Sequence, residues 1–337
     1  MSSVVEKVQR KEELPVSVVV CCYTEERLSD TLEAVASVRR QVLPPEEVIL
    51  VVDNNRKLHE RMQTELSQVA RVVLNEGTCG VSASRNVGIK VARGDLIAFL
   101  DDDAVAEPEW LVRLTGPFRD PDVVAAGGRA VLRWAKSRPS WFPEELDWTI
   151  GGSLSWLPTE PTVVRNPHGF NMCFRREVFG AVGVFATEVG GIGEIPRSGE
   201  EADLCLRIEH RWPTAKVVWE PRAVVVHKVP ASKARFSIIL WRAYCEGLCK
   251  SWIQHSARGD SKDSALSSER AYLTYLLCRA LPPRLALLWR LKVLLQAAAI
   301  VLSIAAAGLG YAMGEIRNMS PFFRFTRKVR RALRERD

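Results

Sequence analysis

Three short polar segments stand directly after apolar, strand-like runs, at residues 23–25, 53–55 and 101–103. The third consists of three aspartates. Adjacent carboxylates repel one another, so such a triplet at the end of a buried strand is costly unless a cation or solvent compensates. Because alternate residues of an extended segment point the same way, Asp101 and Asp103 can act together. Their carboxylates suit Mg²⁺ or Mn²⁺, which favours a metal site over a solvated acidic turn.

Further candidates lie later in the chain. Glu200 and Glu201 begin a helix-like segment, where acidic side chains favour the helix dipole and Ser198 could serve as the N-cap. Capping alone could explain these residues, but a carboxylate beside the glycine-rich loop 190–199 could also act as a general base, with the loop closing over the substrates. His227 ends an apolar strand, where it could be either a structural histidine or a metal ligand.

The segments that must position these groups alternate between apolar strands and helices. Runs rich in β-branched residues predict strands at residues 16–22, 48–52, 71–74 and 96–100. Helices are expected between them, at residues 28–40 and 85–92. Strands that are apolar throughout and alternate with helices are typical of an α/β fold with a mostly parallel, doubly wound sheet. Ligands bind such a sheet outside the carboxyl ends of its strands, where the acidic segments lie.

The middle of the chain is less regular. Residues 133–170 hold many aromatic residues and prolines with little periodicity, which predicts a long connecting structure. Strand-like runs resume at residues 217–219 and 223–227. Four aromatic residues of the connection could line an acceptor groove, although we expect at least half of them to pack in the core: Trp141, Phe142, Trp148 and Trp156.

From residue 236 onward the sequence is helical and strongly apolar. Residues 293–313 carry no charge and are long enough to cross a bilayer. They could span the membrane, form a re-entrant or two-pass membrane hairpin with residues 271–292 that turns near Pro282 and Pro283, or lie in the membrane plane as an amphipathic helix. A buried hairpin of core helices is the alternative without a membrane. The basic segment from residue 324 suits the anionic cytoplasmic leaflet.

These patterns divide the chain into four parts. We expect a polar extension at residues 1–14, a catalytic domain at 15–230, membrane-associated helices at 231–314 and a basic cytoplasmic tail at 315–337. The N-terminal residues have no apolar signal-peptide core, so the catalytic domain is predicted to be cytosolic.

Composition excludes several classes of protein. Hydrophobic residues make up 47% and charged residues 26% of the 337 residues, values typical of a globular chain and against wholesale disorder. The formal net charge is +7, but the excess cations gather beside the apolar tail, which argues against a nucleic-acid partner. The eight cysteines form no CxxC pair, so neither a disulfide framework nor a structural zinc site is expected.

Taken in order, several segments resemble the family 2 glycosyltransferases, which are inverting enzymes with the GT-A fold. The resemblance spans residues 15–227, and its signposts are residues 16–25, Asp53, 75–88, 92–103, 169–176 and 199–207. It implies a set of residues that bind the nucleotide sugar: Thr24, Glu25, Asp53, Arg85, Asp101 and Asp102. It also implies that Asp103, Asp101 and His227 hold a Mn²⁺ or Mg²⁺ ion. Asp53 would bond the nucleobase, and Arg85 would lie near the pyrophosphate.

The catalytic base is less certain in this pattern. The family usually has Glu-Asp where this chain has Glu200-Glu201, and the aspartate is the expected base. Glu201 takes that position with one extra methylene, so the resemblance implies Glu201 or Glu200 as the base. The base would take a proton from an acceptor hydroxyl during a single, inverting displacement.

The resemblance therefore implies metal-dependent transfer from a nucleotide-diphosphosugar, with UDP the expected nucleotide and GDP and dTDP open. The apolar C-terminus suggests a lipid-linked or envelope glycan as acceptor, at the cytosolic face of the cytoplasmic membrane. One alternative is a non-catalytic, sugar-nucleotide-binding membrane scaffold. A sugar-phosphate nucleotidyltransferase is less well supported, because it would need a glycine-rich basic loop where this chain has residues 23–26.

Overall fold

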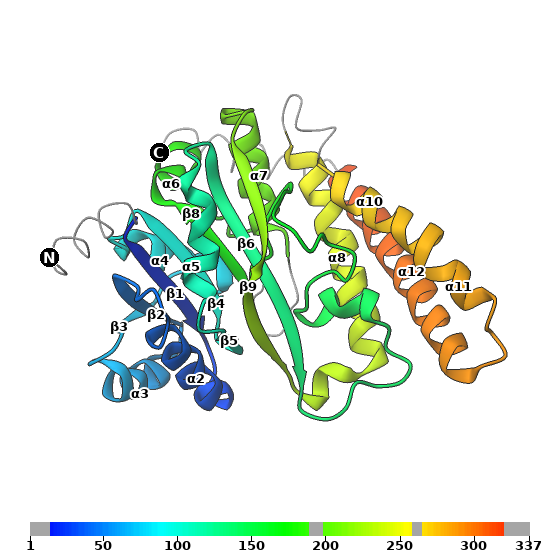
Figure 1. Cartoon of the computed structure of the whole chain (residues 1–337), viewed down its shortest axis with the longest axis horizontal. Helices are drawn as coiled ribbons and strands as arrows, with labels where there is room; N and C mark the ends of the chain where they lie inside the picture. Colours follow the sequence, from blue (N-terminus) through cyan, green and yellow to red (C-terminus); the bar gives the residue numbers. More distant parts are fainter. Residues whose placement is uncertain (1–13, 189–197, 258–264, 320–337) are drawn as a thin grey trace, which may run out of the picture.

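The computed structural model describes residues 14–188, 198–257 and 265–319. A curled, mixed sheet runs through the middle, and the C-terminal helices form a layer at one side of it (Figure 1). Almost all of the predicted N-terminal extension, the glycines of the loop at 190–199 apart from Gly199, and most of the basic tail lie outside the described residues.

The first half of the sheet is parallel and forms from the predicted apolar runs. Its strands are β1 (Val16–Cys22), β2 (Glu47–Asp53), β3 (Arg71–Asn75) and β4 (Leu96–Asp101), in the order β3-β2-β1-β4. The connections contain a short 3₁₀ turn η1 (Glu25–Arg27) and the helices α2 (Leu28–Arg39), α3 (Arg56–Leu66) and α4 (Val81–Val91). The strand order reverses at β1, so the carboxyl ends of β1 and β4 border the crevice where ligands of such sheets bind.

The second half of the sheet is mixed. Its strands and helices are β5 (Ala104–Ala106), α5 (Trp110–Thr115), β6 (Val123–Trp134), β7 (Thr162–Val163), β8 (Asn171–Arg175), α6 (Arg176–Val182), α7 (Glu200–Arg211) and β9 (Lys216–Val229), with 3₁₀ turns η2 (Gly116–Arg119) and η3 (Glu144–Ile150). Strand β8 is antiparallel to β4 and β6, whereas β6 and β9 are parallel. The sequence indicated two runs where β9 is one strand. Its register against β6 shifts after Gly128, opposite Pro221, which has no N–H to join the ladder.

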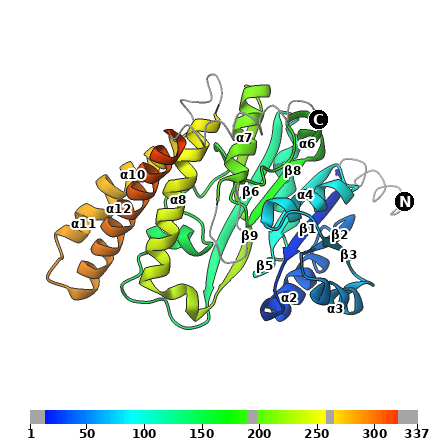
Figure 2. The ribbon, with the colours of Figure 1, turned by 180° about the vertical axis from the view of Figure 1, so that it is seen from behind.

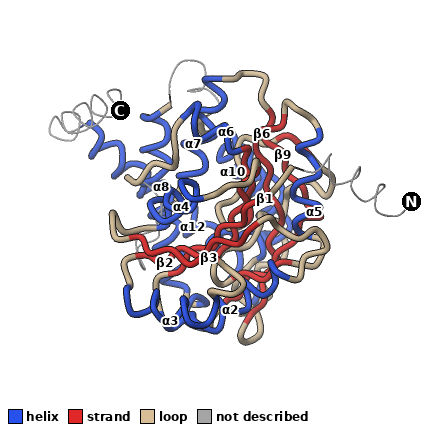
Figure 3. Tube along the Cα trace, turned by 90° about the vertical axis from the view of Figure 1, so that its left-hand side faces the viewer, coloured by secondary structure: helices blue, strands red, loops and turns tan. Residues whose placement is uncertain are grey.

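Helices cover both faces of the sheet (Figure 3). Val18 and Val20 of β1 pack in one hydrophobic cluster with residues of α2, α3 and α5. Val19 of the same strand points to the opposite cluster, which includes Ile89 of α4 and Phe179 of α6. This alternation buries both faces and explains why the strands are mostly apolar.

The C-terminal helices begin after a 3₁₀ turn η4 (Ala231–Ala234). They are α8 (Phe236–Ser256), α10 (Ser267–Tyr275), a π-helical turn (Leu276–Ala280), α11 (Leu281–Leu285) and α12 (Leu291–Met319). Helix α8 lies between the sheet and α12, as both face views show (Figures 1 and 2). Glycines permit the close contact of α8 with α12. A Cβ on Gly247 would lie 1.9 Å from the Ala307 carbonyl oxygen, and one on Gly310 would lie 2.0 Å from that of Tyr244.

Helix α12 is the one helix in the described part of the chain that is long and apolar enough to cross a membrane. Only 28% of its most apolar window is buried, so most of that surface faces away from the protein. Residues 271–292, the other limb of the predicted hairpin, form no single long helix. Pro282 and Pro283 lie inside α11, and the chain turns after them, at residues 286–290.

Candidate active site

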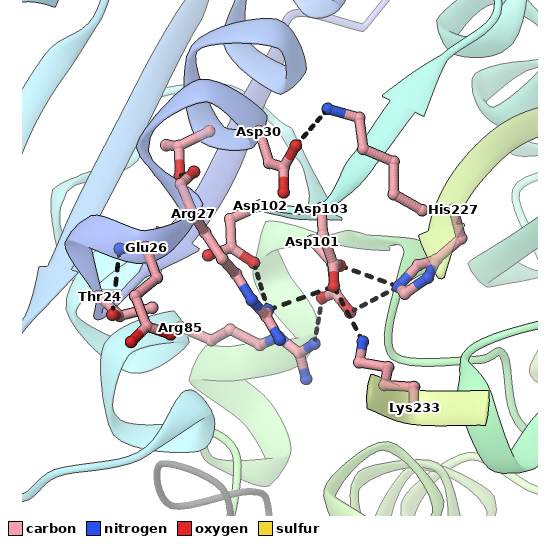
Figure 4. A network of polar contacts seen from close by, with 12 residues as sticks. Thr24, Glu26, Arg27, Asp30, Arg85, Asp101, Asp102, Asp103, His227 and Lys233 are labelled. Carbon is pink, nitrogen blue, oxygen red and sulfur yellow. Dashed lines mark hydrogen bonds and ion pairs between the residues drawn. The ribbon is translucent and has the colours of Figure 1, made fainter. Parts of the chain in front are cut away.

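The acidic triplet lies at the carboxyl end of β4, where a second strand brings a histidine to it. Ala104 of β5 pairs with His227 of β9 across the sheet. His227 Nε2 is consequently 3.0 Å from Asp103 Oδ1 and 3.8 Å from Asp101 Oδ2 (Figure 4). The ligand atoms of these three residues lie within 4.8 Å of one another. Carboxylate oxygens with one imidazole nitrogen are a donor set that fits Mn²⁺ or Mg²⁺, so the residues fit the predicted ion.

Cations surround the triplet. Arg27 Nη1 lies 3.0 Å from Asp102 Oδ1 and 3.2 Å from Asp103 Oδ2, and Lys233 Nζ lies 3.1 Å from Asp103 Oδ2 (Figure 4). Burial acts to raise the pKa of Asp103, but His227, Lys233 and Arg27 outweigh it and hold that pKa well below its usual value. Asp102 differs, because burial and the charge of Asp103 raise its pKa. Asp103 is therefore a charged carboxylate at the centre of the group.

His227 is also electrostatically unusual. Burial acts to lower its pKa, but the charge of Asp103 and hydrogen bonds to both Asp101 and Asp103 outweigh burial and raise the pKa to about 9. A metal ion can bind only the neutral ring, so loading the site would release this proton.

Arg85 of α4 joins the triplet to the candidate base. Its buried guanidinium donates to Glu200 Oε1 at 2.7 Å, to the Gly169 carbonyl at 2.7 Å and to Asp101 Oδ1 at 3.3 Å. Opposite charges this close form a rigid link between β4 and the first turn of α7. Arg85 thus holds two site carboxylates in addition to facing the cavity.

Glu200 and Glu201 begin α7, but the cap differs from the prediction. The N-cap is Gly199, at φ 104°, a conformation that favours glycine. Ser198 does not cap the helix, because its hydroxyl donates to the carboxylate of Glu246 on α8. Tertiary packing of α7 against α8 has overridden the local capping preference.

The two glutamates have different surroundings. Glu200 is paired with Arg85, while its Oε2 is buried without a partner among the described residues. Glu201 forms no ion pair with any described residue, and burial together with the charge of Glu200 raises its pKa to about 8. A carboxylate with a pKa near the working pH and a free face suits general-base chemistry better than one held by an arginine.

The residues predicted to hold the nucleoside are only partly brought together. Thr24 and Asp53 line the same cavity as the triplet. Asp53 accepts from Asn75 Nδ2 at 2.7 Å and from the Gly80 amide at 2.8 Å, so it also orders the turn after β3. Glu25 is not among the residues that line the cavity, and its carboxylate faces Lys57 at 3.0 Å.

One large cavity of about 1730 Å³ contains this site and extends to the C-terminal helices. It exceeds the several hundred Å³ of an ordinary small-molecule site, so it has room for two substrates. Of the four aromatic residues expected near an acceptor groove, Trp148 and Trp156 line it. Phe142 is buried in a separate hydrophobic cluster, and Trp141 packs against that cluster.

Sequence reasoning missed three cations of the cavity. Arg27 and Lys233 pair with the triplet, but nothing in their spacing from it along the chain signals this contact. Arg242 of α8 is half-buried and donates to the Thr149 carbonyl at 2.9 Å, and it forms no ion pair with any residue that the structure describes. The other arginines and lysines of the cavity wall each face a carboxylate, except the exposed Arg235.

Comparison with known proteins found matches over most of the chain. The model of the family described as Glycosyl transferase family 2 matches residues 17–183. A glucosyl-dolichyl phosphate glucuronosyltransferase from Haloferax volcanii is 34% identical over 307 residues, covering 89% of this chain and 96% of that protein. A mannosyltransferase from Pyrobaculum calidifontis, solved with GDP-Man and Mn²⁺, covers 93% of this chain and 83% of its own at 19% identity and a TM-score of 0.53. GalNAc-T7, solved with UDP, GalNAc and Mn²⁺, covers 80% of this chain and 57% of its own at 18% identity and a TM-score of 0.50. The solved structures confirm the predicted fold.

Proposed function

The chain belongs to glycosyl transferase family 2, and we propose that it is a metal-dependent, inverting enzyme acting on a lipid-linked glycan. As a glycosyltransferase it uses a nucleotide sugar. The observation that carries the finer proposal is that Asp101, Asp103 and His227 converge in the cavity that Glu201 also lines. A metal site and a candidate base within one space match the needs of sugar transfer from a diphosphate.

The reaction follows from the placement of these residues. Glu201 takes the proton of an acceptor hydroxyl as the hydroxyl oxygen forms a bond to the anomeric carbon. The bond between that carbon and the diphosphate oxygen breaks, and the diphosphate leaves with the electron pair. A single displacement inverts the anomeric centre and needs no covalent nucleophile. When bound, a Mn²⁺ or Mg²⁺ ion supplies positive charge to the departing diphosphate.

The protein's own cations add to that charge. Arg242 has no carboxylate partner among the described residues, and the charge of Asp103 acts on it, so it is available to a phosphate beside the metal site. Arg85 donates to both Asp101 and Glu200, so it fixes the proposed metal site relative to the first turn of α7, which carries the candidate base. We propose that Thr24 and Asp53 hold the nucleoside, with UDP as the donor nucleotide.

The acceptor is proposed to be lipid-linked, which the printed name of the Haloferax relative supports for that protein. Large apolar side chains are exposed along α11, the following turn and α12, including Leu285, Trp289 and Leu309. Helix α8, which packs on α12, carries Arg242 and Lys250 on the face that lines the cavity. Because a bilayer core excludes such charges, we propose that α12 lies in the membrane plane, at the cytosolic face of the cytoplasmic membrane.

Calorimetric titration tests this function. Protein in detergent is titrated with UDP, GDP and dTDP in the presence of Mn²⁺, Mg²⁺ or EDTA. We expect one nucleotide to bind only with metal and Asp103→Ala to lose that binding. Asp95→Ala is the matched control, because Asp95 lies just before β4, at the opposite end of the same strand. Failure of all three nucleotides to bind the folded protein with metal would refute the proposal.

A further inference from the structure

The cavity holds a second group of buried polar atoms without partners. Six of the eight such side-chain atoms in the described part of the chain belong to residues that line it. Asp102, Glu200 and His227 supply three of them and are part of the site described above. The remaining atoms are Trp156 Nε1, His168 Nδ1 and Ser303 Oγ. Native proteins satisfy nearly all buried polar groups, so unpartnered atoms on several residues that line one cavity indicate a polar ligand.

Aromatic rings with fixed orientations accompany these atoms. The ring of Trp156 stacks on Tyr275 of α10, with centroids 6.0 Å apart. Nearby on α10, Tyr272 accepts from Trp148 Nε1 at 2.9 Å and donates to the Glu145 carbonyl at 2.6 Å. These contacts hold the rings in place without consuming the Nε1 proton of Trp156. Flat ring faces beside free hydrogen-bonding groups suit a sugar, whose C–H face is apolar and whose edge carries hydroxyls.

The charges in this part of the cavity cancel. Lys250 Nζ lies 2.7 Å from Glu246 and 2.9 Å from Glu269, and Arg165 makes two hydrogen bonds to Glu269 at 2.6 and 2.8 Å. Burial, with a smaller effect from Lys250, lowers the pKa of His168 to about 4, so its ring is neutral at physiological pH. With its cations already paired, this region is suited to a neutral ligand more than to a phosphate.

This region adjoins the candidate base. Ser198, three residues before Glu201, donates to Glu246, which pairs with Lys250, and Glu201, His168 and Lys250 all line the cavity. We propose that Trp156, His168 and Ser303 form a subsite for a neutral pyranose ring of the acceptor. Trp156 donates its Nε1–H to a ring hydroxyl, Ser303 exchanges a hydrogen bond with another, and His168 donates or accepts according to its tautomer. The identification of this pyranose ring as part of the acceptor rests on the proposed function. The binding of a neutral sugar at this subsite does not depend on the proposed function.

Saturation-transfer NMR measures this binding directly. Full-length protein is placed in a zwitterionic detergent without a sugar headgroup and mixed with methyl glucoside, methyl mannoside or methyl glucuronide, without metal or nucleotide. We expect a neutral glycoside to bind more tightly than the anionic glucuronide. Trp156→Phe keeps an aromatic ring but removes the N–H, so it should raise the Kd about 2- to 12-fold, the range for one hydrogen bond. Ser303→Ala should have an effect of similar size.

Trp212→Phe is the control, because Trp212 is partly buried outside the cavity. Its Kd should equal that of the wild type. The proposal is overturned if no neutral glycoside binds the folded wild-type protein, or if Trp156→Phe and Ser303→Ala both bind as tightly as the wild type. The nucleotide titration on the same preparation reports on the proposed function separately, since it needs the metal and Asp103 and the glycoside does not.

Discussion

Replacing Glu201 by Gln should abolish sugar transfer while leaving nucleotide binding intact. The substitution keeps the size of the side chain but removes its ability to take a proton, and a positioned general base contributes about 10²- to 10⁴-fold. The rate is followed as nucleoside diphosphate released from the nucleotide sugar in the presence of acceptor. Metal-dependent nucleotide affinity, measured on the same samples, should stay within about twofold of the wild type. Glu201 is neither one of the predicted metal ligands nor one of the residues predicted to bind the nucleotide.

The pH profile gives this prediction its magnitude. With a pKa of about 8, about one tenth of the Glu201 carboxyls are ionised at pH 7 and about nine tenths at pH 9. The base must be ionised to act, so kcat/KM should rise about tenfold between these values and level off above pH 9. Glu200 raises this pKa, while Lys250 and Arg85 lower it.

Glu200→Gln is the informative second variant. Its amide oxygen can still accept from Arg85, so the link to α4 survives while the neighbouring negative charge disappears. The pKa of Glu201 should then fall, and the rising limb of the profile should move to lower pH. Two results would refute the reasoning: full activity in Glu201→Gln, or loss of activity in Glu200→Gln with no shift of the profile. The second result would make Glu200 the base.

Three further predictions concern the helices around the cavity. Arg242→Gln should weaken metal-dependent nucleotide binding about 13- to 160-fold in calorimetry, as expected for one charge-assisted contact, whereas the exposed Arg235→Gln should not. Gly310→Ala should lower the Tm, because its Cβ would meet an α8 carbonyl at 2.0 Å, whereas Gly308→Ala, with nothing within 4 Å, should leave the Tm unchanged or raise it. Trp289→Ser, at a side chain 75% exposed, should weaken partitioning to anionic vesicles about 13- to 160-fold in cosedimentation, since a large buried apolar side chain contributes about 1.5–3 kcal/mol.

The parallel half of the fold was predictable because burial leaves a clear trace in composition. Strands such as β1 and β2 are covered on both faces, so they are apolar after Ser17 and Glu47 near their starts, and the next polar residue marks the strand end. Asp53 and Asp101 are the last residues of their strands for this reason. Strand β6 was not recognised, since its burial changes from continuous to alternating along its length, and neither pattern persists long enough to stand out.

The electrostatic partners in the site could not be predicted. Arg27 and Asp102 are 75 residues apart, and their contact depends on how two connections pack, which leaves no periodic signal in either segment. Ser198 illustrates the same limit at short range. Its type and position favour an N-cap, in which its hydroxyl oxygen would accept from a backbone N–H, but the hydroxyl instead donates to Glu246 of α8 and Gly199 takes the N-cap position. Residue types and positions suggested a metal site at Asp101 and Asp103 and a base at Glu200 or Glu201, and resemblance gave the individual roles, which stay predictions until the variants are measured.

Helix α8 contacts the cavity with one face and α12 with another, with almost no space between the backbones at Gly247. Such contact leaves little freedom for the two helices to slide apart. If α12 rests on lipid as proposed, α8 fixes the height of the catalytic carboxylates above the bilayer. The enzyme would then have a set reach: a sugar at one distance from the lipid phosphate meets the base, and shorter or longer chains present their ends too low or too high. Acceptor length would be selected by this spacing, independently of which sugar is recognised.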